Sequence, residues 1–318
     1  MRAALVTAFG QAPRCADTEE PIAAGPDQVV VEVLAAALSP RVRSQADGSH
    51  YTSTGALPVV PGIDGVGRLP DGGLVYFLLP GVGQGSMAER VAIDRHRSVA
   101  LPDDADPAAL AAAMNPAMAS WVALRRRTEF RPGQRVLVLG ATGSAGRAAV
   151  EVAHRLGAGD VVAAGRRAER MADLPEVGAT RLVELGGDPA EAARALAEAG
   201  RDVDVVLDFL WGEPTRAALL AIIPARTRDE QTLTWIQIGS VAGRESSIPS
   251  AALRAVDLRL VGSGQGSVGA REYRDEIEVL SREIHAGAFR VPTRTVALTD
   301  VEAAWNDRTS TERLVIVP

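Results

Sequence analysis

One apolar run that ends in glycine and other small residues constrains the fold of this chain more than any other stretch. The run covers residues 135–139, and residues 140–146 are all glycine, alanine, serine or threonine. Apolar residues at helical spacing follow over residues 147–157, and a second apolar run begins at Asp160. This order predicts a strand, a tight turn, a helix and a second strand, the unit that places a dinucleotide pyrophosphate at a helix N-terminus.

The turn matches the glycine pattern of such units with one replacement. When Gly-x-Gly-x-x-Gly is aligned to it, the three positions are Ala141, Gly143 and Gly146. Gly143 would let the backbone approach the phosphates, and Gly146 would let the helix pack closely on the sheet. The flanking strand and helix favour this interpretation over an ordinary turn that binds nothing, which stays the alternative. We expect cofactor contacts from the whole turn, namely Gly140, Ala141, Thr142, Gly143, Ser144, Ala145 and Gly146.

The residues after the second strand discriminate between NAD and NADP. An NAD site would carry Asp or Glu about 20 residues beyond the glycine turn, to bind the ribose 2′-hydroxyl. Here the strand ends in Gly165, Arg166 and Arg167, and Arg170 follows one turn later. Guanidinium groups pair with a 2′-phosphate, which a carboxylate would repel. We therefore predict NADPH as the cofactor, and these four residues as its contacts; the alternative is a solvated run of surface arginines.

Composition and charge exclude several other classes of function. The 318 residues suffice for about two domains, and a net charge of −6 offers no basic face to nucleic acid. No apolar run approaches the ~20 residues that cross a bilayer, and the first residues do not resemble a signal peptide. The single cysteine, Cys15, excludes an internal disulfide and a multi-cysteine zinc site, and it suits a reducing cytoplasm. The four histidines lack metal-ligand spacing, so we expect no metal.

Lysine is absent, because all 34 basic residues are arginine. Schiff-base chemistry therefore has no nucleophile in this chain. The Tyr-x-x-x-Lys pair on which short-chain dehydrogenases usually rely is also missing.

The pattern of elements changes along the chain. Residues 1 to about 100 predict short strands with turns, and helices are expected at 107–114 and 117–127. Strands and helices then alternate, which indicates a doubly wound parallel sheet. The expected strands are 181–185, 203–209, 233–239 and 258–262, and the expected helices between them are 189–199, 214–222 and 249–256. A helix at 270–286, strands at 291–298 and 314–317 and a short helix at 300–305 complete the chain, and we expect them to rejoin the first domain.

Five motifs together resemble the medium-chain dehydrogenase/reductases, and specifically the zinc-free quinone oxidoreductase branch that includes zeta-crystallin. They are residues 61–67, 131–138, 140–146, 203–208 with Gly212, and 238–240. The resemblance implies an α/β fold, with a doubly wound parallel (Rossmann) NADPH-binding domain at 116–264. This domain would be inserted in a GroES-like, mostly β catalytic domain formed by 1–115 plus 265–318. It also implies a homodimer that pairs the edge strand 258–261 of two copies.

This chain departs from parts of the family pattern. The Cys and Gly-His-Glu ligands of zinc-dependent members, and their four-cysteine lobe, are missing. Ser39-Pro40 stands where the family often has Asn-Pro, and Ala119 lies near the position of a threonine that helps to seat the nicotinamide. These departures bear on the substrate and leave the fold expectation intact.

Without zinc, hydrogen-bond donors must stabilise the charge that hydride transfer creates on a carbonyl oxygen. Quinones and activated α,β-unsaturated carbonyls suit such a site, because conjugation spreads that charge. The predicted catalytic residues are Tyr51, His50 and Ser39, with Arg43 behind them. The alternatives are an aromatic at the rim for Tyr51, an exposed loop position for His50 and a structural ion pair for Arg43. Asp64 is interpreted as structural.

Ligands of doubly wound sheets bind beyond the carboxyl ends of the strands. We therefore expect further cofactor contacts from the ends of the late strands, at Phe209, Leu210, Gly239, Ser240, Gly262 and Ser263. The predicted protein is a cytoplasmic, homodimeric, NADPH-dependent and metal-free reductase of a small-molecule quinone or enone, with no nucleic-acid or membrane partner. The alternatives are an enoyl or double-bond reductase of a biosynthetic pathway, and a low-turnover NADPH-binding redox sensor.

Overall fold

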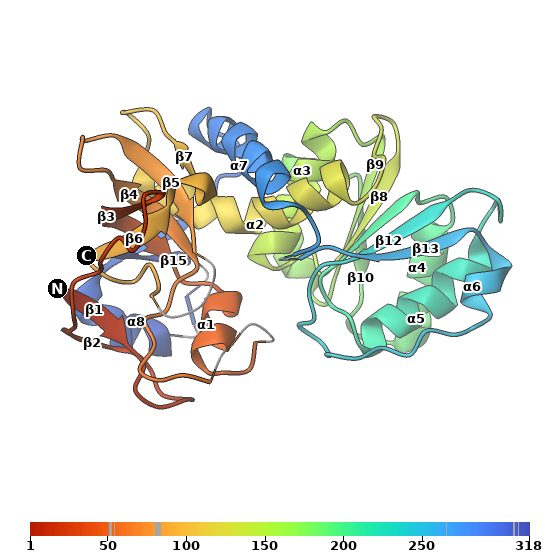
Figure 1. Ribbon diagram of the computed structural model, residues 1–318. Coiled ribbons are helices and arrows are strands. Elements are labelled where there is room, and N and C mark those ends of the chain that lie inside the picture. The colour runs from red at the N-terminus through yellow and green to blue at the C-terminus, as the bar shows by residue number, and fades with distance from the viewer. Residues whose placement is uncertain (51–52, 54, 80–83, 265, 308, 311) are drawn as a thin grey trace. The chain divides into compact units, whose positions relative to one another are not determined.

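Two main sheets, one parallel and one mostly antiparallel, organise the chain (Figure 1). The computed structural model describes residues 1–50, 53, 55–79, 84–264, 266–307, 309–310 and 312–318. The chain divides into unit 1, made of Met1–Asn115 with Ala270–Pro318, and unit 2, made of Pro116–Gly269. Each unit has its own buried apolar core.

Unit 2 contains a six-stranded sheet in which every neighbouring pair is parallel. Its order is β10-β9-β8-β11-β12-β13, so the chain reverses its direction of progress between β8 and β11. The strands are β8 (Arg135–Leu139), β9 (Asp160–Gly165), β10 (Arg181–Glu184), β11 (Val205–Asp208), β12 (Leu233–Gln237) and β13 (Leu258–Gly262). The helices are α3 (Ser144–Arg155), α4 (Pro189–Gly200), α5 (Glu213–Ile222) and α6 (Ala252–Ala255). The predicted doubly wound sheet is confirmed.

Both faces of this sheet are covered, as its apolar strands require. Leu137 and Leu139 share a core with Leu196 of α4 and Leu219 of α5. The alternate residue Val138 faces the other side, because successive side chains of a strand point in opposite directions, and it is also fully buried. Burial on both faces explains why these strands appear in the sequence as uninterrupted apolar runs.

Helix α2 (Pro107–Arg126) differs from the expectation of two helices, because it continues through Pro116. A proline inside a helix removes one backbone hydrogen bond. Here apolar side chains on both sides of it, Met114, Met118 and Trp121 among them, are buried. Its 20 residues are long and apolar enough to cross a membrane, so the expectation that no apolar run approaches that length is wrong for α2. Within its 18-residue apolar window, 72% of the residues are buried inside the protein, as in a core helix.

Unit 1 combines residues from both ends of the chain in one sheet, of order β14-β15-β3-β4-β5-β7, with β6 also paired to β3. The strands are β3 (Gln28–Ala37), β4 (Asp64–Arg68), β5 (Leu74–Leu78), β6 (Arg90–Asp94), β7 (Ser98–Ala100), β14 (Thr293–Ala297) and β15 (Arg313–Val317). Strands β1 (Arg2–Leu5) and β2 (Arg14–Asp17) form a separate antiparallel pair. The helices are α1 (Pro40–Ala46), α7 (Ala270–His285) and α8 (Val301–Asn306).

Short 3-10 helices occur in both units, at Arg95–Arg97, Ala168–Arg170, Leu174–Val177, Ile223–Ala225 and Leu298–Asp300.

Strand β4 is one of the elements that the sequence pattern does not predict. Its Gly65 and Gly67 resemble turn residues, yet both lie within the strand. A Cβ atom on either would lie 2.8 Å from a carbonyl oxygen of β3, that of Ala35 or of Glu32. The glycines therefore serve the close approach of two strands.

A buried hydrogen bond fixes the start of β4. Tyr76 on β5 donates from its hydroxyl to Oδ2 of Asp64 at 2.6 Å, and both residues are buried. Burial raises the pKa of the Asp64 carboxyl, while the bond from Tyr76 and the charges of Arg313 and Arg41 act to lower it. Because this pKa is raised, Asp64 favours folding below its unfolded pKa of about 3.9, and the contribution is lost as pH rises through the folded pKa.

The substitution Tyr76→Phe tests this account. It removes a hydrogen bond that lowers the pKa of Asp64, so that pKa rises further. We expect a loss of about 1–3 kcal/mol in the free energy of unfolding near pH 8, and a smaller loss near pH 4.5, where more of the carboxyl is protonated. Urea unfolding at the two pH values measures the difference. Equal losses for Tyr76→Phe at both pH values would contradict the account.

Candidate functional site

The turn between β8 and α3 is held tightly to the neighbouring strand. Gly140 and Ala141 both donate from their backbone N–H groups to the carbonyl oxygen of Ala164 on β9, at 2.9 and 3.0 Å. Gly140 has a φ of +93°, a left-handed conformation that disfavours any side chain. A Cβ atom there would also lie 2.9 Å from Cδ2 of Leu210. Local backbone geometry therefore requires this glycine.

Gly146 and Gly143 are glycines for different reasons. A Cβ atom on Gly146 would lie 2.1 Å from the carbonyl oxygen of Gly140, so α3 can pack on the turn only without a side chain here. A Cβ atom on Gly143 would come no closer than 3.9 Å to an atom of the chain, and its φ of −86° suits any residue. Neither packing nor backbone conformation within the described protein demands a glycine at 143. A ligand that approaches the backbone would demand it.

The N-terminus of α3 is open to such a ligand. The first N–H groups of a helix have no partner within the helix, and Gly143, its N-cap, supplies no side chain to accept from them. Gly143 and Ser144 are exposed. These N–H groups and the helix dipole suit a phosphate. The residues fit the pyrophosphate predicted from the sequence.

The predicted arginines follow the adjacent strand. Gly165 ends β9, and a Cβ atom on it would lie 2.6 Å from Cγ2 of Thr142, so this strand end packs against the turn. Arg166, Arg167 and Arg170 come directly after it and are exposed. Among the described residues of unit 2, the ion pairs with carboxylates are made by other arginines and do not involve these three guanidinium groups. They are available to an anion outside the chain.

The ends of β11, β12 and β13 bring the other predicted cofactor residues to the same edge of the sheet. Leu210 lies against Gly140, since a Cβ atom on that glycine would come within 2.9 Å of Cδ2 of Leu210. Gly239 packs on the carbonyl oxygen of Phe209, which a Cβ atom would approach to 2.7 Å, and Ser240 beside it is exposed. Gly262 and Ser263 are held through their backbone atoms. The carbonyl oxygen of Gly262 accepts from Nε of Arg127 at 2.8 Å, and the N–H of Ser263 donates to the carbonyl oxygen of Gln237 at 2.8 Å.

Sequence reasoning assigned no role to the residue that shapes this edge, Asp208. Its buried carboxylate accepts from the N–H groups of Leu210 and Trp211 and from the side chains of Thr215 and Trp235. The sequence signal that could have identified Asp208 is an aspartate at the end of a strand, directly before a loop. Trp235 and Trp121 are both buried.

The predicted catalytic residues all belong to unit 1. Ser39 is buried, and its Oγ accepts from the N–H of Val42 at 3.0 Å, which makes it the N-cap of α1, a helix that the sequence pattern does not predict. His50 follows that helix and is half-buried; burial, followed by the charge of Arg41, lowers its pKa. Tyr51 lies outside the described residues.

Arg43 links two helices of unit 1. Its guanidinium donates to the carbonyl oxygen of Trp305 on α8 and lies over the ring of the same residue, 5.1 Å from the ring centroid. This contact favours the structural alternative for Arg43.

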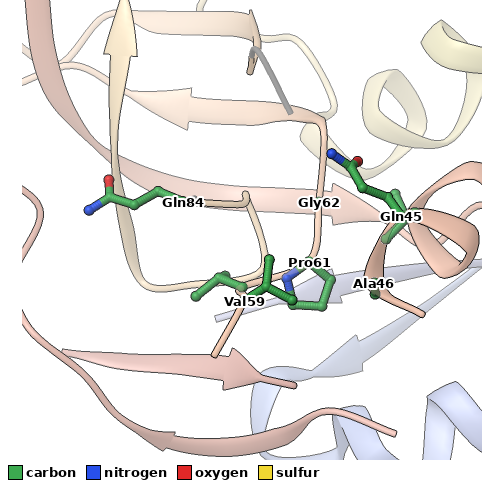
Figure 2. A pocket seen from close by; sticks show the side chains of 8 residues that line it. Gln45, Ala46, Val59, Pro61, Gly62 and Gln84 are labelled. Atoms are coloured by element: carbon green, nitrogen blue, oxygen red, sulfur yellow. The ribbon is translucent and has the colours of Figure 1, made fainter. Parts of the chain in front are cut away.

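A small pocket lies beside α1 (Figure 2). Apolar residues form most of its wall, and two carboxamide side chains complete it; the residues are Val42, Gln45, Ala46, Val59, Val60, Pro61, Gly62 and Gln84. In Figure 2 the carboxamides of Gln45 and Gln84 lie on opposite sides. The enclosed volume of about 10 Å³ is room for a single water molecule. No residue that lines it is charged within the described part of the chain.

Across the residues that the structure describes, no three side chains of His, Cys, Asp or Glu come together as a metal ion would need.

Known proteins similar to this chain include reductases that match it over their full length. No family model matches the sequence. A probable NADPH-dependent quinone reductase of Emericella nidulans, tdiC, is 31% identical, and the match covers 100% of both proteins. The solved quinone oxidoreductase of Thermus thermophilus, known also in complex with NADPH, is 26% identical, with a TM-score of 0.80 over 100% of both chains.

A second relative is much longer than this chain. A phenolphthiocerol/phthiocerol polyketide synthase of Mycobacterium tuberculosis is 27% identical over 88% of this chain, and the match spans 13% of that synthase polypeptide.

Two alanine substitutions distinguish the roles of the turn glycines. Gly146→Ala forces a Cβ atom against a backbone carbonyl, so we expect it to lower the free energy of unfolding by about 1–3 kcal/mol. Gly143→Ala meets open space, and we expect a loss below about 1 kcal/mol, the cost of a poorer N-cap. Chemical denaturation of the two variants without added ligand measures both. Equal losses would show that packing alone requires both glycines.

Proposed function

This chain belongs to the quinone oxidoreductases of the medium-chain dehydrogenase/reductase family, and we propose that it transfers hydride from NADPH to a quinone or an activated α,β-unsaturated carbonyl without a metal. The observation that carries the proposal is Gly143, an exposed glycine that its own chain does not require, at the uncapped N-terminus of α3. The full-length similarity to an NADPH-dependent quinone reductase supports it.

The chain binds the coenzyme in three places. The N–H groups at the start of α3 hold the pyrophosphate, and the open space at Gly143 admits it to the backbone. Arg166 and Arg167, with Arg170, pair with the 2′-phosphate. When bound, NADPH supplies the hydride from C4 of its nicotinamide. Phe209, Leu210, Gly239, Ser240, Gly262 and Ser263, at the ends of the late strands, orient the nicotinamide half.

The hydride acceptor develops negative charge on an oxygen atom, which must be met by a hydrogen-bond donor. We assign this role to Tyr51 and His50 of unit 1, with Ser39 as a supporting hydroxyl. A lowered pKa keeps the imidazole of His50 neutral near pH 7, and neutral imidazole still donates one N–H bond. The hydroxyl of Ser39 accepts from Val42 and retains its own proton to donate.

The similarity to a polyketide synthase favours a second candidate, the reduction of an enoyl double bond in a biosynthetic pathway. The chemistry at C4 of the coenzyme is the same, and the acceptor would be an enoyl thioester. A third possibility, a redox sensor, would bind NADPH tightly and reduce no quinone, enone or thioester. The homodimer through β13 stays a prediction of the resemblance, and the cytoplasmic location stays a prediction from the single cysteine.

Replacement of both Arg166 and Arg167 by alanine tests the cofactor. Each lost charge-assisted hydrogen bond corresponds to about tenfold or more in affinity, so we expect KM for NADPH to rise about a hundredfold, with little change for NADH. The control is Arg194→Ala, an exposed arginine of α4, which should change neither value. A wild-type protein that prefers NADH would contradict the assignment.

Tyr51→Phe and His50→Gln test the donors. If either side chain donates to the reacting oxygen, its loss should lower kcat/KM for the acceptor about a hundredfold or more and leave the Kd for NADPH unchanged. NADPH absorbance, followed with a panel of quinones, enones, aldehydes and enoyl thioesters, measures the rates and identifies the acceptor class. Unchanged kcat/KM in a variant would remove that residue from the mechanism.

A further inference from the structure

A buried carboxylate at the end of β11 is fully hydrogen-bonded to the protein. Asp208 has no exposed surface. Its Oδ1 accepts from the N–H groups of Leu210 at 2.9 Å and Trp211 at 3.0 Å. Its Oδ2 accepts from Oγ1 of Thr215 at 2.6 Å and from Nε1 of Trp235 at 2.9 Å. All four donors are neutral, and together they occupy the capacity of a carboxylate.

This arrangement argues against acid–base chemistry at Asp208. A general base must reach the proton that it removes, and Asp208 is closed off from solvent and from any ligand by its own donors. Its two oxygen atoms instead face different parts of unit 2. Oδ1 holds the loop that follows β11, while Oδ2 ties the carboxylate to α5 and β12.

The loop that Oδ1 holds has an unfavourable backbone conformation. Trp211 has a φ of +56°, in the left-handed region that a bulky side chain rarely adopts, and Gly212 follows with a φ of +70°. Such conformations persist only where the surroundings fix them. The two bonds from Oδ1 close the turn at Leu210 and Trp211, as aspartate side chains do in turns. Ser246 adds a third constraint, a hydrogen bond to the carbonyl oxygen of Gly212 at 2.8 Å.

The same loop lies between two stretches that bind the coenzyme in the proposed function. On one side, the Leu210 side chain lies against Gly140 of the glycine turn. On the other, the carbonyl oxygen of Leu210 accepts from the N–H of Ala242 at 2.9 Å, and that of Phe209 lies close to Gly239. Since β8 and β11 are adjacent, this loop occupies the point where the strand order reverses, the ligand crevice of doubly wound sheets.

We propose that Asp208 is a positioning residue for the coenzyme: its buried carboxylate holds residues 209–212 in the shape that forms one wall of the NADPH site. The inference rests on the proposed function. It predicts that loss of the Oδ1 bonds weakens coenzyme binding, while loss of one bond at Oδ2 does not.

Three variants separate these bonds. Asp208→Ala removes all four, and we expect the Kd for NADPH to rise about a hundredfold, the equivalent of two lost hydrogen bonds to a charged group. Asp208→Asn leaves the two loop N–H groups a weaker, uncharged acceptor, so we expect the Kd to rise about three- to tenfold. Thr215→Val removes one bond at Oδ2 with little change of shape, and we expect a change below about threefold. Fluorescence titration with NADPH measures each Kd.

Amide hydrogen exchange of the coenzyme-free protein provides a second measurement. The N–H groups of Leu210 and Trp211 should exchange faster in Asp208→Ala than in the wild type or in Thr215→Val. At saturating NADPH, kcat should fall less than KM rises.

The outcomes separate the two proposals. A wild-type protein that does not bind NADPH would overturn the proposed function. If the wild type binds NADPH, and Asp208→Ala and Asp208→Asn bind it with the same Kd, the positioning role alone would be overturned. If Asp208→Ala does not fold, Asp208→Asn decides: weaker binding together with faster exchange at Leu210 and Trp211 supports the role, and wild-type values for both overturn it.

Discussion

The close packing of α3 on the end of β8 is the constraint on which the rest of unit 2 depends. It exists because Gly140 and Gly146 have no side chains: a Cβ atom on Gly146 would lie 2.1 Å from the carbonyl oxygen of Gly140. The helix can therefore begin directly after the strand, with its first N–H groups at the carboxyl edge of the sheet. Since all neighbouring strands are parallel, the ends of β9, β11 and β12 reach the same edge.

Charge is divided at this edge in a way that suits an anionic coenzyme. The positive groups, which are the helix N-terminus and the guanidiniums after β9, are exposed and available to a ligand. The carboxylate of Asp208 is buried and bonded to neutral donors, so it shapes a loop and is out of reach of a ligand.

The sequence predicts unit 2 well because strands buried on both faces are continuous apolar runs, as at residues 136–139 and 161–164. It fails where a residue serves a distant partner. Gly65 and Gly67 of β4 make room for β3, although their type suggests a turn. Helix α1 has seven residues, of which only Val42 and Ala46 are buried, so its periodicity is too weak to recognise. The carboxylate of Asp208 is also bonded to Trp235, 27 residues away, a partner that spacing cannot connect to it.

The same physical difference explains why the sequence indicates the coenzyme more sharply than the substrate. The coenzyme site is made largely of backbone N–H groups and of glycines whose absent side chains leave space, so a short motif describes it. The donors that would meet a substrate oxygen are side chains of unit 1, and their neighbours already modify them. Ser39 caps a helix, and burial shifts the pKa of His50. A residue type alone does not show whether a side chain is already used to hold the fold. The choice of hydride acceptor therefore depends on which donors of unit 1 are free of structural hydrogen bonds and can reach the substrate oxygen.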